Sequence, residues 1–356
     1  AVIGSVDDLG ATFYNPGQLS LVKDPNFLFS ARVFEYQNIS LKPDYPALNP
    51  ASKSKLTPSP SFIVFNLSSD WLGKTNLAFS FLTRQTFDTR LKTRYVGDLE
   101  DLDVSNETLY EGNTDEYWGG ITLSYPIYGK YSLGVGLTNY IAVRSYRSRS
   151  SINSQSIDSL QNVGILSGTR EYEYYNVRIL WKAGIGFTFE SIRFGLTLTT
   201  PSINLFGSGE TDINLNSSGV DIDGDNVSDE FLLSDYQEGL PSTYSSSFAI
   251  GLGIYYRFGD FKVHFSSEYY SKVSQFNVLT SNQFQSQTGN FLLTNNLTHA
   301  LKPIFNFGLG LEFLVSKKVT TFGAFVTDFS ALDEEVRSNH SVSLWDFYHI
   351  TGGASL

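Results

Sequence analysis

Residues 174–190, "YYNVRILWKAGIGFTFE", alternate between two kinds of side chain. Every odd position from Val177 to Phe187 is apolar, and the even positions between them include Arg178, Lys182, Gly184 and Gly186. The alternation resumes over 192–199, after a turn at 190–191. Successive side chains of a strand point to opposite faces, so this period of two predicts two antiparallel strands that share one apolar face.

The same alternation recurs over 131–145, 245–270 and 306–326. It fits either a water-soluble β-sandwich or a barrel in a membrane. Three features favour the barrel. Many of the patterned runs are ten to fifteen residues long, whereas soluble strands average about 5–6 residues. The connections alternate between very short and very long, and Tyr, Trp and Phe cluster at the ends of the runs, as in an interfacial girdle.

Composition excludes several classes of function. The formal net charge is −11, so no nucleic-acid partner is expected, because such binding needs cations that neutralise phosphates. The absence of cysteine excludes a disulfide framework and thiolate metal sites. No apolar run reaches the roughly 18 residues of a transmembrane helix, which leaves the closed barrel as the way to cross a membrane.

Counting the patterned runs predicts an all-β, transmembrane antiparallel β-barrel. Its twelve strands are expected at 27–36, 61–69, 74–90, 114–126, 130–147, 170–189, 191–203, 242–257, 260–277, 300–315, 319–329 and 341–354. Short periplasmic turns are expected at 70–73, 127–130, 190–191, 259–260 and 316–318. Long extracellular loops are expected at 37–60, 91–113, 148–169, 204–241, 278–299 and 330–340.

The last residues, "HITGGASL", lack the terminal aromatic that outer-membrane barrels usually carry on their closing strand. We therefore expect a further closing hairpin that is missing from this chain, making 14 strands. Closure with the twelve strands is the alternative.

The stretch "DDLGATFYNPGQLSLVKDPNFLFSARVFEYQNISLK", residues 7–42, begins with an irregular segment and then enters the first strand. It resembles the start of the FadL family of outer-membrane long-chain fatty-acid and hydrophobic-compound transporters. The matching positions are Asp7, Asp8, Asn15, Pro16 and Leu19. Gly17 stands where the family usually has Ala, and it keeps the close backbone approach. The resemblance continues through 57–82 and 194–209.

This resemblance implies a fourteen-stranded barrel with an N-terminal hatch in its lumen. Residues 1–26 would be the hatch, with Asp7, Asp8, Asn15, Pro16 and Gly17 as its motif, and residues 27–356 the barrel. Irregular backbone is tolerated inside a barrel because protein and water line it. A disordered N-terminal arm is the alternative.

The resemblance also implies location in the bacterial outer membrane and passive uptake of hydrophobic small molecules such as long-chain fatty acids. The expected partners are outer-membrane lipid, lipopolysaccharide, a hydrophobic ligand and other outer-membrane proteins. The competing hypothesis is a FadL-like barrel that acts as a non-transporting binding or assembly subunit of a larger outer-membrane complex. A lumen packed solid would favour that hypothesis.

Alternation also assigns charged side chains to the lumen. The basic ones are Arg32, Arg84, Arg144, Arg178, Lys182, Arg193, Lys262 and His264, with Glu268 and Glu312 among the acids. A fatty-acid carboxylate needs a cation beside an apolar slot. Arg144 and Arg178, flanked by Tyr140 and Tyr174, are the candidate ligand-binding residues. The alternative is that the lumen charges pair across the barrel and hydrate it.

Catalysis is not expected. Four histidines and no cysteine leave few arrangements of nucleophile and base, and alternation points His264 and Ser266 into the lumen.

Residues 221–230, "DIDGDNVSDE", carry a calcium-type pattern. Asp221, Asp223, Asp225 and Asp229 stand at positions 1, 3, 5 and 9, with the Val227 carbonyl at position 7. The twelfth position is Leu232 rather than the Glu of an EF-hand. We expect a structural Ca²⁺ that braces the loop 204–241, with a solvated acidic turn as the alternative.

A second run, residues 98–116, has eight acids and no Lys or Arg. It is expected to be a solvated loop or a face for lipopolysaccharide bridged by divalent cations.

Overall fold

The computed structural model describes residues 3–22, 27–41, 51–67, 70–99, 102–127, 132–158, 161–221, 227–316, 318–333 and 345–355. Side chains are not described for 31–41, 51–61, 70 and 99.

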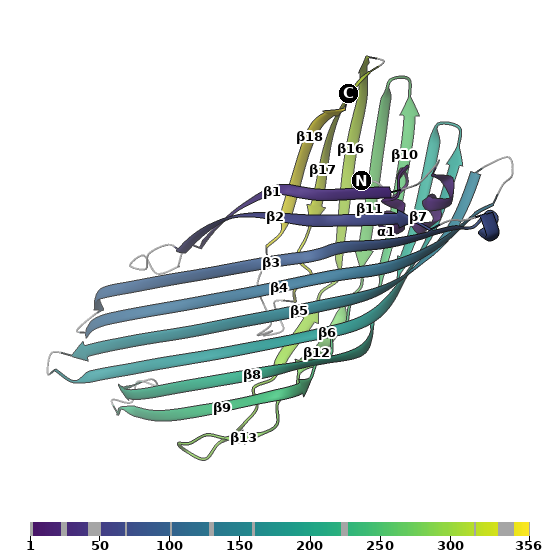
Figure 1. Ribbon diagram of the computed structural model, residues 1–356. Coiled ribbons are helices and arrows are strands. Elements are labelled where there is room, and N and C mark those ends of the chain that lie inside the picture. The colour runs from purple at the N-terminus through teal and green to yellow at the C-terminus, as the bar shows by residue number, and fades with distance from the viewer. Residues whose placement is uncertain are drawn as a thin grey trace.

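One antiparallel sheet dominates the fold (Figure 1). Its main path runs through β1 (Phe27–Leu41), β2 (Ala51–Asn66), β3 (Asn76–Leu99), β4 (Leu102–Ile127), β5 (Ser132–Asp158), β6 (Val163–Phe189), β7 (Ile192–Thr199), β10 (Ala249–Phe258), β11 (Phe261–Tyr270), β16 (Ile304–Ser316), β17 (Val319–Asp328) and β18 (Phe347–Ser355). The predicted fold class is confirmed, and each predicted strand has its counterpart on this path. The count of fourteen barrel strands is not confirmed. Among the described residues β1 and β18 do not pair, so the sheet is not closed.

The prediction of a loop at 204–241 was wrong. This segment forms β8 (Ile203–Val220) and β9 (Asp229–Pro241), and β8 pairs with β6 from Ile165 to Ile179. The other end of β6, from Lys182 to Phe189, pairs with β7. β6 therefore changes partner along its length, and the β8–β9 hairpin widens the sheet on one side of the molecule (Figure 1).

The loops predicted at 91–113 and 148–169 were also largely wrong, because β3 to β6 continue through most of these residues. These four strands have 24 to 27 residues each. Each of these strands is therefore about twice as long as the roughly 9–11 residues that a strand needs to cross a bilayer. The predicted tight turns at 190–191 and 259–260 are confirmed, with Glu190 and Gly259 at positive φ.

The outer face of β4 shows where the sheet changes character. From Tyr117 to Ile127 the outward side chains are mostly apolar and exposed, including Ile121, Leu123 and Tyr125. Toward the strand's other end the outward positions become polar, beginning at Asp115. The apolar stretch of about 11 residues matches one transmembrane crossing.

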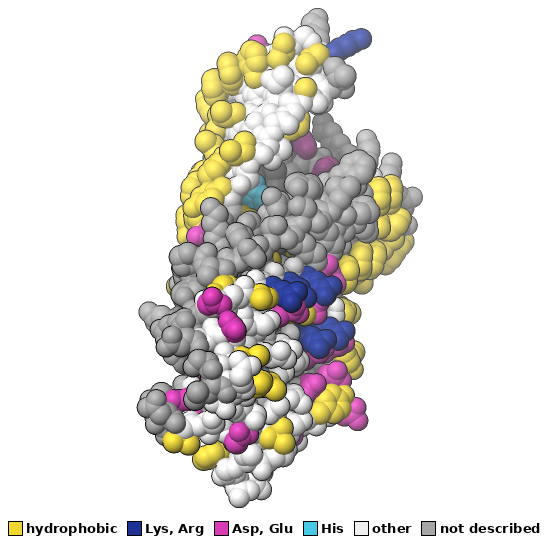
Figure 2. Space-filling view, turned by 90° about the vertical axis from the view of Figure 1, so that its left-hand side faces the viewer, with side chains coloured by type: hydrophobic (Ala, Val, Ile, Leu, Met, Phe, Trp, Pro, Cys, Tyr) yellow, Lys and Arg dark blue, Asp and Glu magenta, His cyan; other side chains and the backbone are white. Residues whose placement is uncertain are grey.

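Beyond this apolar stretch, ion pairs connect the outer faces of β3 to β6. Arg90 pairs with Glu111, Lys92 with Glu107, and Arg147 with Glu171. Figure 2 shows basic and acidic side chains side by side on this part of the surface. Glu107 and Glu111 belong to the acidic run 98–116, which therefore lies mostly on paired strands rather than in a loop.

The remaining elements are short. α1 (Ala11–Tyr14) and the 3₁₀ helix η1 (Pro16–Leu21) lie near the N-terminus, and η2 (Asp70–Leu72) lies in the turn between β2 and β3. β12 (Val273–Leu279) pairs with β15 (Leu297–Leu301), and β13 (Phe284–Gln285) pairs with β14 (Leu292–Leu293). Among the residues with described structure, no helix is long and apolar enough to cross a membrane.

Candidate functional site

Residues 3–21, here called the N-terminal segment, lie against a row of glycines on the inner face of the sheet. Gly134, Gly186, Gly195 and Gly253 are paired directly across β5, β6, β7 and β10. A Cβ on any of them would collide with Gly17, Gln18, Ile3 or Gly4 of the segment. The missing side chains thus leave a groove in which backbone lies on backbone.

Asn15 fastens the centre of this segment. Its side-chain amide donates to the carbonyl of Ile3 (2.9 Å) and to that of Ile185 on β6 (3.0 Å). Its side-chain oxygen accepts from the Gly17 backbone N–H (3.1 Å) and so caps η1. Asn15, Pro16 and Gly17 are all buried. The motif read from the sequence is therefore the part of the segment in closest contact with the wall.

The two predicted acids lie apart from this contact. Asp7 and Asp8 are exposed. Asp8 Oδ1 accepts from the Gly10 backbone N–H (2.7 Å) just before α1.

A second polar contact ties the segment to β11, the strand next to β10. Ser5 Oγ lies 2.8 Å from Nδ1 of His264 on β11, and His264 Nε2 lies 2.9 Å from Glu312 on β16. Lys262 Nζ pairs with the other oxygen of Glu312 (2.7 Å). The contacts of the segment therefore extend over the consecutive strands β5, β6, β7, β10 and β11. The sequence placed His264, Lys262 and Glu312 inward, but gave no signal for Ser5.

A cavity of about 760 Å³ lies above the N-terminal segment. Ile3, Phe13 and Tyr14 of the segment form part of its lining. Aromatic residues from the sheet and its connections also line it, among them Trp118, Tyr270 and Phe307. Among the described lining residues, the arginines and lysines are Arg84, Arg144, Arg178 and Lys182, and the acidic residues are Glu116, Glu268 and Asp328.

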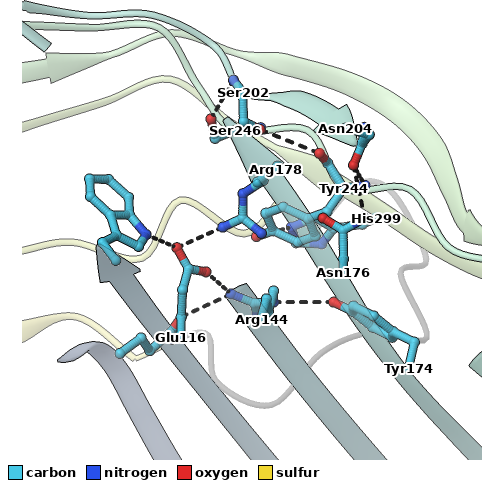
Figure 3. A network of polar contacts seen from close by, with 12 residues as sticks. Glu116, Arg144, Tyr174, Asn176, Arg178, Ser202, Asn204, Tyr244, Ser246 and His299 are labelled. Atoms are coloured by element: carbon cyan, nitrogen blue, oxygen red, sulfur yellow. Dashed lines mark hydrogen bonds and ion pairs between the residues drawn. The ribbon is translucent and has the colours of Figure 1, made fainter. Parts of the chain in front are cut away.

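One wall of the cavity carries a buried cluster of two arginines and one glutamate (Figure 3). Glu116 of β4 pairs through Oε2 with Arg144 Nη1 (2.8 Å) and through Oε1 with Arg178 Nη2 (2.6 Å). Trp118 Nε1 donates to Glu116 Oε1 (2.6 Å), and Arg144 Nε donates to the Tyr174 hydroxyl (3.1 Å). Each of the three charged side chains is less than 10% exposed. The cluster therefore holds two positive charges and one negative charge in a largely dry setting.

Arg178 has unused hydrogen-bonding capacity. Its Nε and Nη1 atoms are buried and have no hydrogen-bond partner in the described structure. A buried guanidinium usually has its N–H groups satisfied, because an unmet donor costs about 1–3 kcal/mol. Together with the surplus positive charge, these donors favour an anionic group of a ligand at this wall.

The predicted residues Arg144, Arg178 and Tyr174 are thus brought together. Tyr140 is not part of their contacts, since its hydroxyl donates to the Thr12 carbonyl of the N-terminal segment (2.7 Å).

Segments that connect strands of the main sheet also line the cavity, next to the arginine cluster. We call β12, β15 and residues 242–248 the roof. Tyr244 of the roof stacks under the guanidinium groups of both Arg144 and Arg178, 4.5 and 4.6 Å from the ring centre, and its ring also contacts Phe276 and His299. The apolar contacts of the roof involve Tyr146, Tyr172, Tyr174, Leu240, Tyr244, Val278, Leu279 and Leu297. Sequence periodicity missed Tyr244 and His299, because both come from predicted strand ends or loops without an informative pattern.

His299 lies outside the barrel strands and is almost fully buried. Burial, with a smaller contribution from the Arg144 charge, lowers the pKa of His299 to about 3. The ring is therefore neutral at pH 7. Protonation would place a charge in a buried position and so destabilise the packing of the roof.

The other predicted lumen residues are dispersed. Lys182 lies over the Phe13 ring of the N-terminal segment (5.0 Å), and Arg193 lies over Tyr255 (5.2 Å). Arg84 is the extra residue of a bulge between β3 and β4, and lies 5.7 Å from the Trp118 ring. The side chain of Arg32 lies outside the described side chains.

The predicted calcium site lies only partly within the described residues. Asp223 and Asp225 lie outside the described residues, while Asp221, Val227 and Asp229 border that gap. Among the residues that are described, no group of three or more His, Cys, Asp or Glu side chains could hold a metal ion.

No family model and no curated protein matches the sequence. Solved structures do match. The toluene transporter TodX of Pseudomonas putida has a TM-score of 0.55 at 13% identity, covering 99% of this chain and 86% of that one. The toluene transporter TbuX of Ralstonia pickettii scores 0.56 at 14%, covering 97% and 83%. A FadL homologue of Pseudomonas aeruginosa scores 0.51 at 11%, covering 99% and 82%.

The chain has the fold of these transporters. The resemblance to the FadL family noted in residues 7–42 is thereby confirmed at the level of the fold. These structural neighbours are transporters rather than enzymes.

Proposed function

We propose that this protein is an outer-membrane channel for the passive uptake of hydrophobic small molecules. The observation that carries the proposal is the cavity of about 760 Å³, which lies between the N-terminal segment and the roof. Its lining combines aromatic rings with a few charged groups, as binding pockets for small organic molecules do. The N-terminal segment acts in this proposal as the hatch that narrows the lumen.

The arginine cluster supports a finer proposal about the ligand. Long-chain fatty acids carry one carboxylate on an apolar tail. The carboxylate would accept hydrogen bonds from Arg178 Nε or Nη1, which have no partner in the described structure. The tail would lie against aromatic side chains such as Phe13 and Trp118. Charge-assisted hydrogen bonds of this kind are worth about 1.5–3 kcal/mol.

The outer surface supports location in the outer membrane. The exposed apolar stretch of β4 from Tyr117 to Ile127 spans one bilayer crossing. The ion pairs beyond it, such as Arg147 with Glu171, lie where the outer face of the strands leaves the apolar zone. Lipid would contact the apolar stretch, and lipopolysaccharide head groups would contact the charged region.

The test compares Arg178→Lys with Arg193→Lys in liposomes that contain the purified protein. Both arginines point into the lumen, but Arg193 does not line the cavity. Lysine at 178 keeps the charge beside Glu116 and removes the planar fork that supplies several donors. We expect dodecanoate affinity to fall by about tenfold or more for Arg178→Lys, with little change for Arg193→Lys and with dodecane uptake unchanged in both.

An equal dodecanoate affinity of the two variants, measured from the concentration dependence of uptake, would contradict the carboxylate role of Arg178. Liposomes with the unchanged protein that admit neither dodecanoate nor dodecane faster than empty liposomes would contradict the channel itself. That second result would favour the subunit hypothesis. The presence of a large cavity, rather than a lumen packed solid, supports the channel over the subunit.

A further inference from the structure

The cavity has a second group of cations, at its floor. Lys182 of β6 lines the cavity beside Phe13 of the N-terminal segment and is 5% exposed. Arg84, on the bulge of β3, also lines it and lies against Trp118. Neither of these two side chains makes an ion pair with a described carboxylate. A buried ammonium without a paired anion is costly, because burial removes its water.

The surroundings of Lys182 do not remove this cost. Burial is the largest effect on its charge; Glu268 attracts that charge without forming an ion pair, and the exposed Arg84 repels it by a smaller amount. Glu268 itself accepts a hydrogen bond from the Tyr270 hydroxyl (3.2 Å). An anion between Lys182 and Arg84 would therefore relieve both the desolvation of Lys182 and the repulsion between the two cations.

Lys182 of the floor and Arg178 of the arginine cluster lie at different positions along the same strand, β6. Lys182 and Arg178 are four residues apart on β6 and share its inner face, so their Cα atoms are separated by about 13 Å. Leu180 stands between them on the same face and is fully buried. A cationic side chain, an apolar side chain and a second cationic side chain thus follow one another along the inner face of one strand.

We propose that the cavity binds elongated hydrophobic molecules with an anionic group at each end, of which long-chain α,ω-dicarboxylates are the simplest. One carboxylate binds Arg178 at the roof end. The other binds Lys182 and Arg84 at the floor, directly above Phe13. The methylene chain between them lies along Leu180. This inference rests on the proposed function, since it assigns a second charged subsite to the same cavity.

The experiment measures the binding of dodecanedioate and dodecanoate to the purified protein by isothermal titration calorimetry, in a non-ionic detergent at pH 7.5. The informative quantity is the ratio of the two dissociation constants within each protein. Lys182→Met removes one of the two floor charges and keeps an unbranched side chain that can pack on the Phe13 ring. Lys262→Met is the matched control, because Lys262 also faces the lumen but pairs with Glu312 away from the cavity lining.

In Lys182→Met we expect dodecanedioate to bind about tenfold more weakly relative to dodecanoate, as the loss of one charge-assisted contact predicts. The ratio should not change in Lys262→Met. An unchanged ratio in Lys182→Met, with dodecanoate still bound, would overturn the inference and leave the proposed channel intact. Failure of the unchanged protein to bind either molecule would overturn both. Resistance of the barrel to proteolysis in each variant establishes that the change in ratio is not caused by unfolding.

Discussion

Replacement of Gly17 by alanine tests whether the N-terminal segment is held by backbone contact with the glycine row. A Cβ at this position would lie 2.6 Å from the Gly184 carbonyl oxygen and 2.7 Å from that of Gly134. Ordinary contacts begin at 3.4 Å, so the segment must withdraw by 3.4 − 2.6 = 0.8 Å. Both obstacles are strand backbone, which cannot rotate away as a flexible side chain could.

A withdrawal of this size also lengthens the hydrogen bonds of Asn15. Its amide lies 3.0 Å from the Ile185 carbonyl, and an added 0.8 Å exceeds the usual limit of about 3.2 Å. Overpacking costs about 1–3 kcal/mol and the lost hydrogen bond about 1 kcal/mol. The total of about 2–4 kcal/mol corresponds to a roughly 30- to 1,000-fold increase in local opening.

Hydrogen exchange of the backbone amides in residues 3–21 measures this opening. We expect exchange in the Gly17→Ala variant to accelerate by that factor, while the strands β3 to β6 keep their protection. Gly119→Ala on β4 is the control, because nothing lies within 4 Å of its added Cβ. Equal exchange of the segment in the Gly17→Ala and Gly119→Ala variants would refute the argument from close contact.

Three further changes have defined outcomes. Asn15→Ala removes two donated hydrogen bonds and should raise permeability to hydrophobic antibiotics. Unchanged permeability would contradict a role of Asn15 in holding the hatch in place. The lowered pKa of His299 means that its stabilising contribution is complete above pH 6.5 and is lost as the pH falls toward 3. At pH 5 the roof should be about 2 kcal/mol less stable, seen as faster proteolysis that a His299→Phe variant no longer shows. If calcium binds residues 221–230, a chelator and the Asp223→Asn, Asp225→Asn double variant should both increase cleavage within 204–241, and identical cleavage with and without chelator would count against the ion.

The parts of the strands with an apolar outer face could be predicted, because the barrel fold expected from the sequence restricts that face to apolar residues. Between Val177 and Phe187 this constraint produces an alternation that no other element imitates at that length. The same strands continue outside the apolar zone, where water accepts polar side chains on either face. The hairpin of β8 and β9 was therefore missed, and so were the ends of β3 to β6.

The two arginines of the cluster could be predicted, but its glutamate was missed. Arg144 and Arg178 fall on inward positions of strongly patterned strands. Glu116 was assigned to a solvated acidic run, although its position carried a signal. Counting back by twos from the inward Thr122 through Gly120 and Trp118 reaches Glu116. Ser5, Tyr244 and His299 could not be found in this way, because contacts made by irregular segments depend on where the chain returns in space.

Part of the glycine row could be predicted from the strand register alone. In a hairpin with a two-residue turn, residues equally far before and after the turn face each other. The turn at 190–191 therefore places Gly186 opposite Gly195, and the structure has this pair. Glycine weakens a strand, and two glycines placed opposite one another offer no cross-strand contact in return.

Such a pair is therefore a sign that something else comes close to the backbone. The sequence contains this sign, but only the structure shows that Ile3 and Gln18 of the N-terminal segment occupy the space. The outward neighbours Ile185 and Phe187 keep the apolar face of the same strand. One strand thus presents exposed apolar side chains on its outer face and contacts the N-terminal segment on its inner face, and its alternation of apolar residues with glycine follows from both.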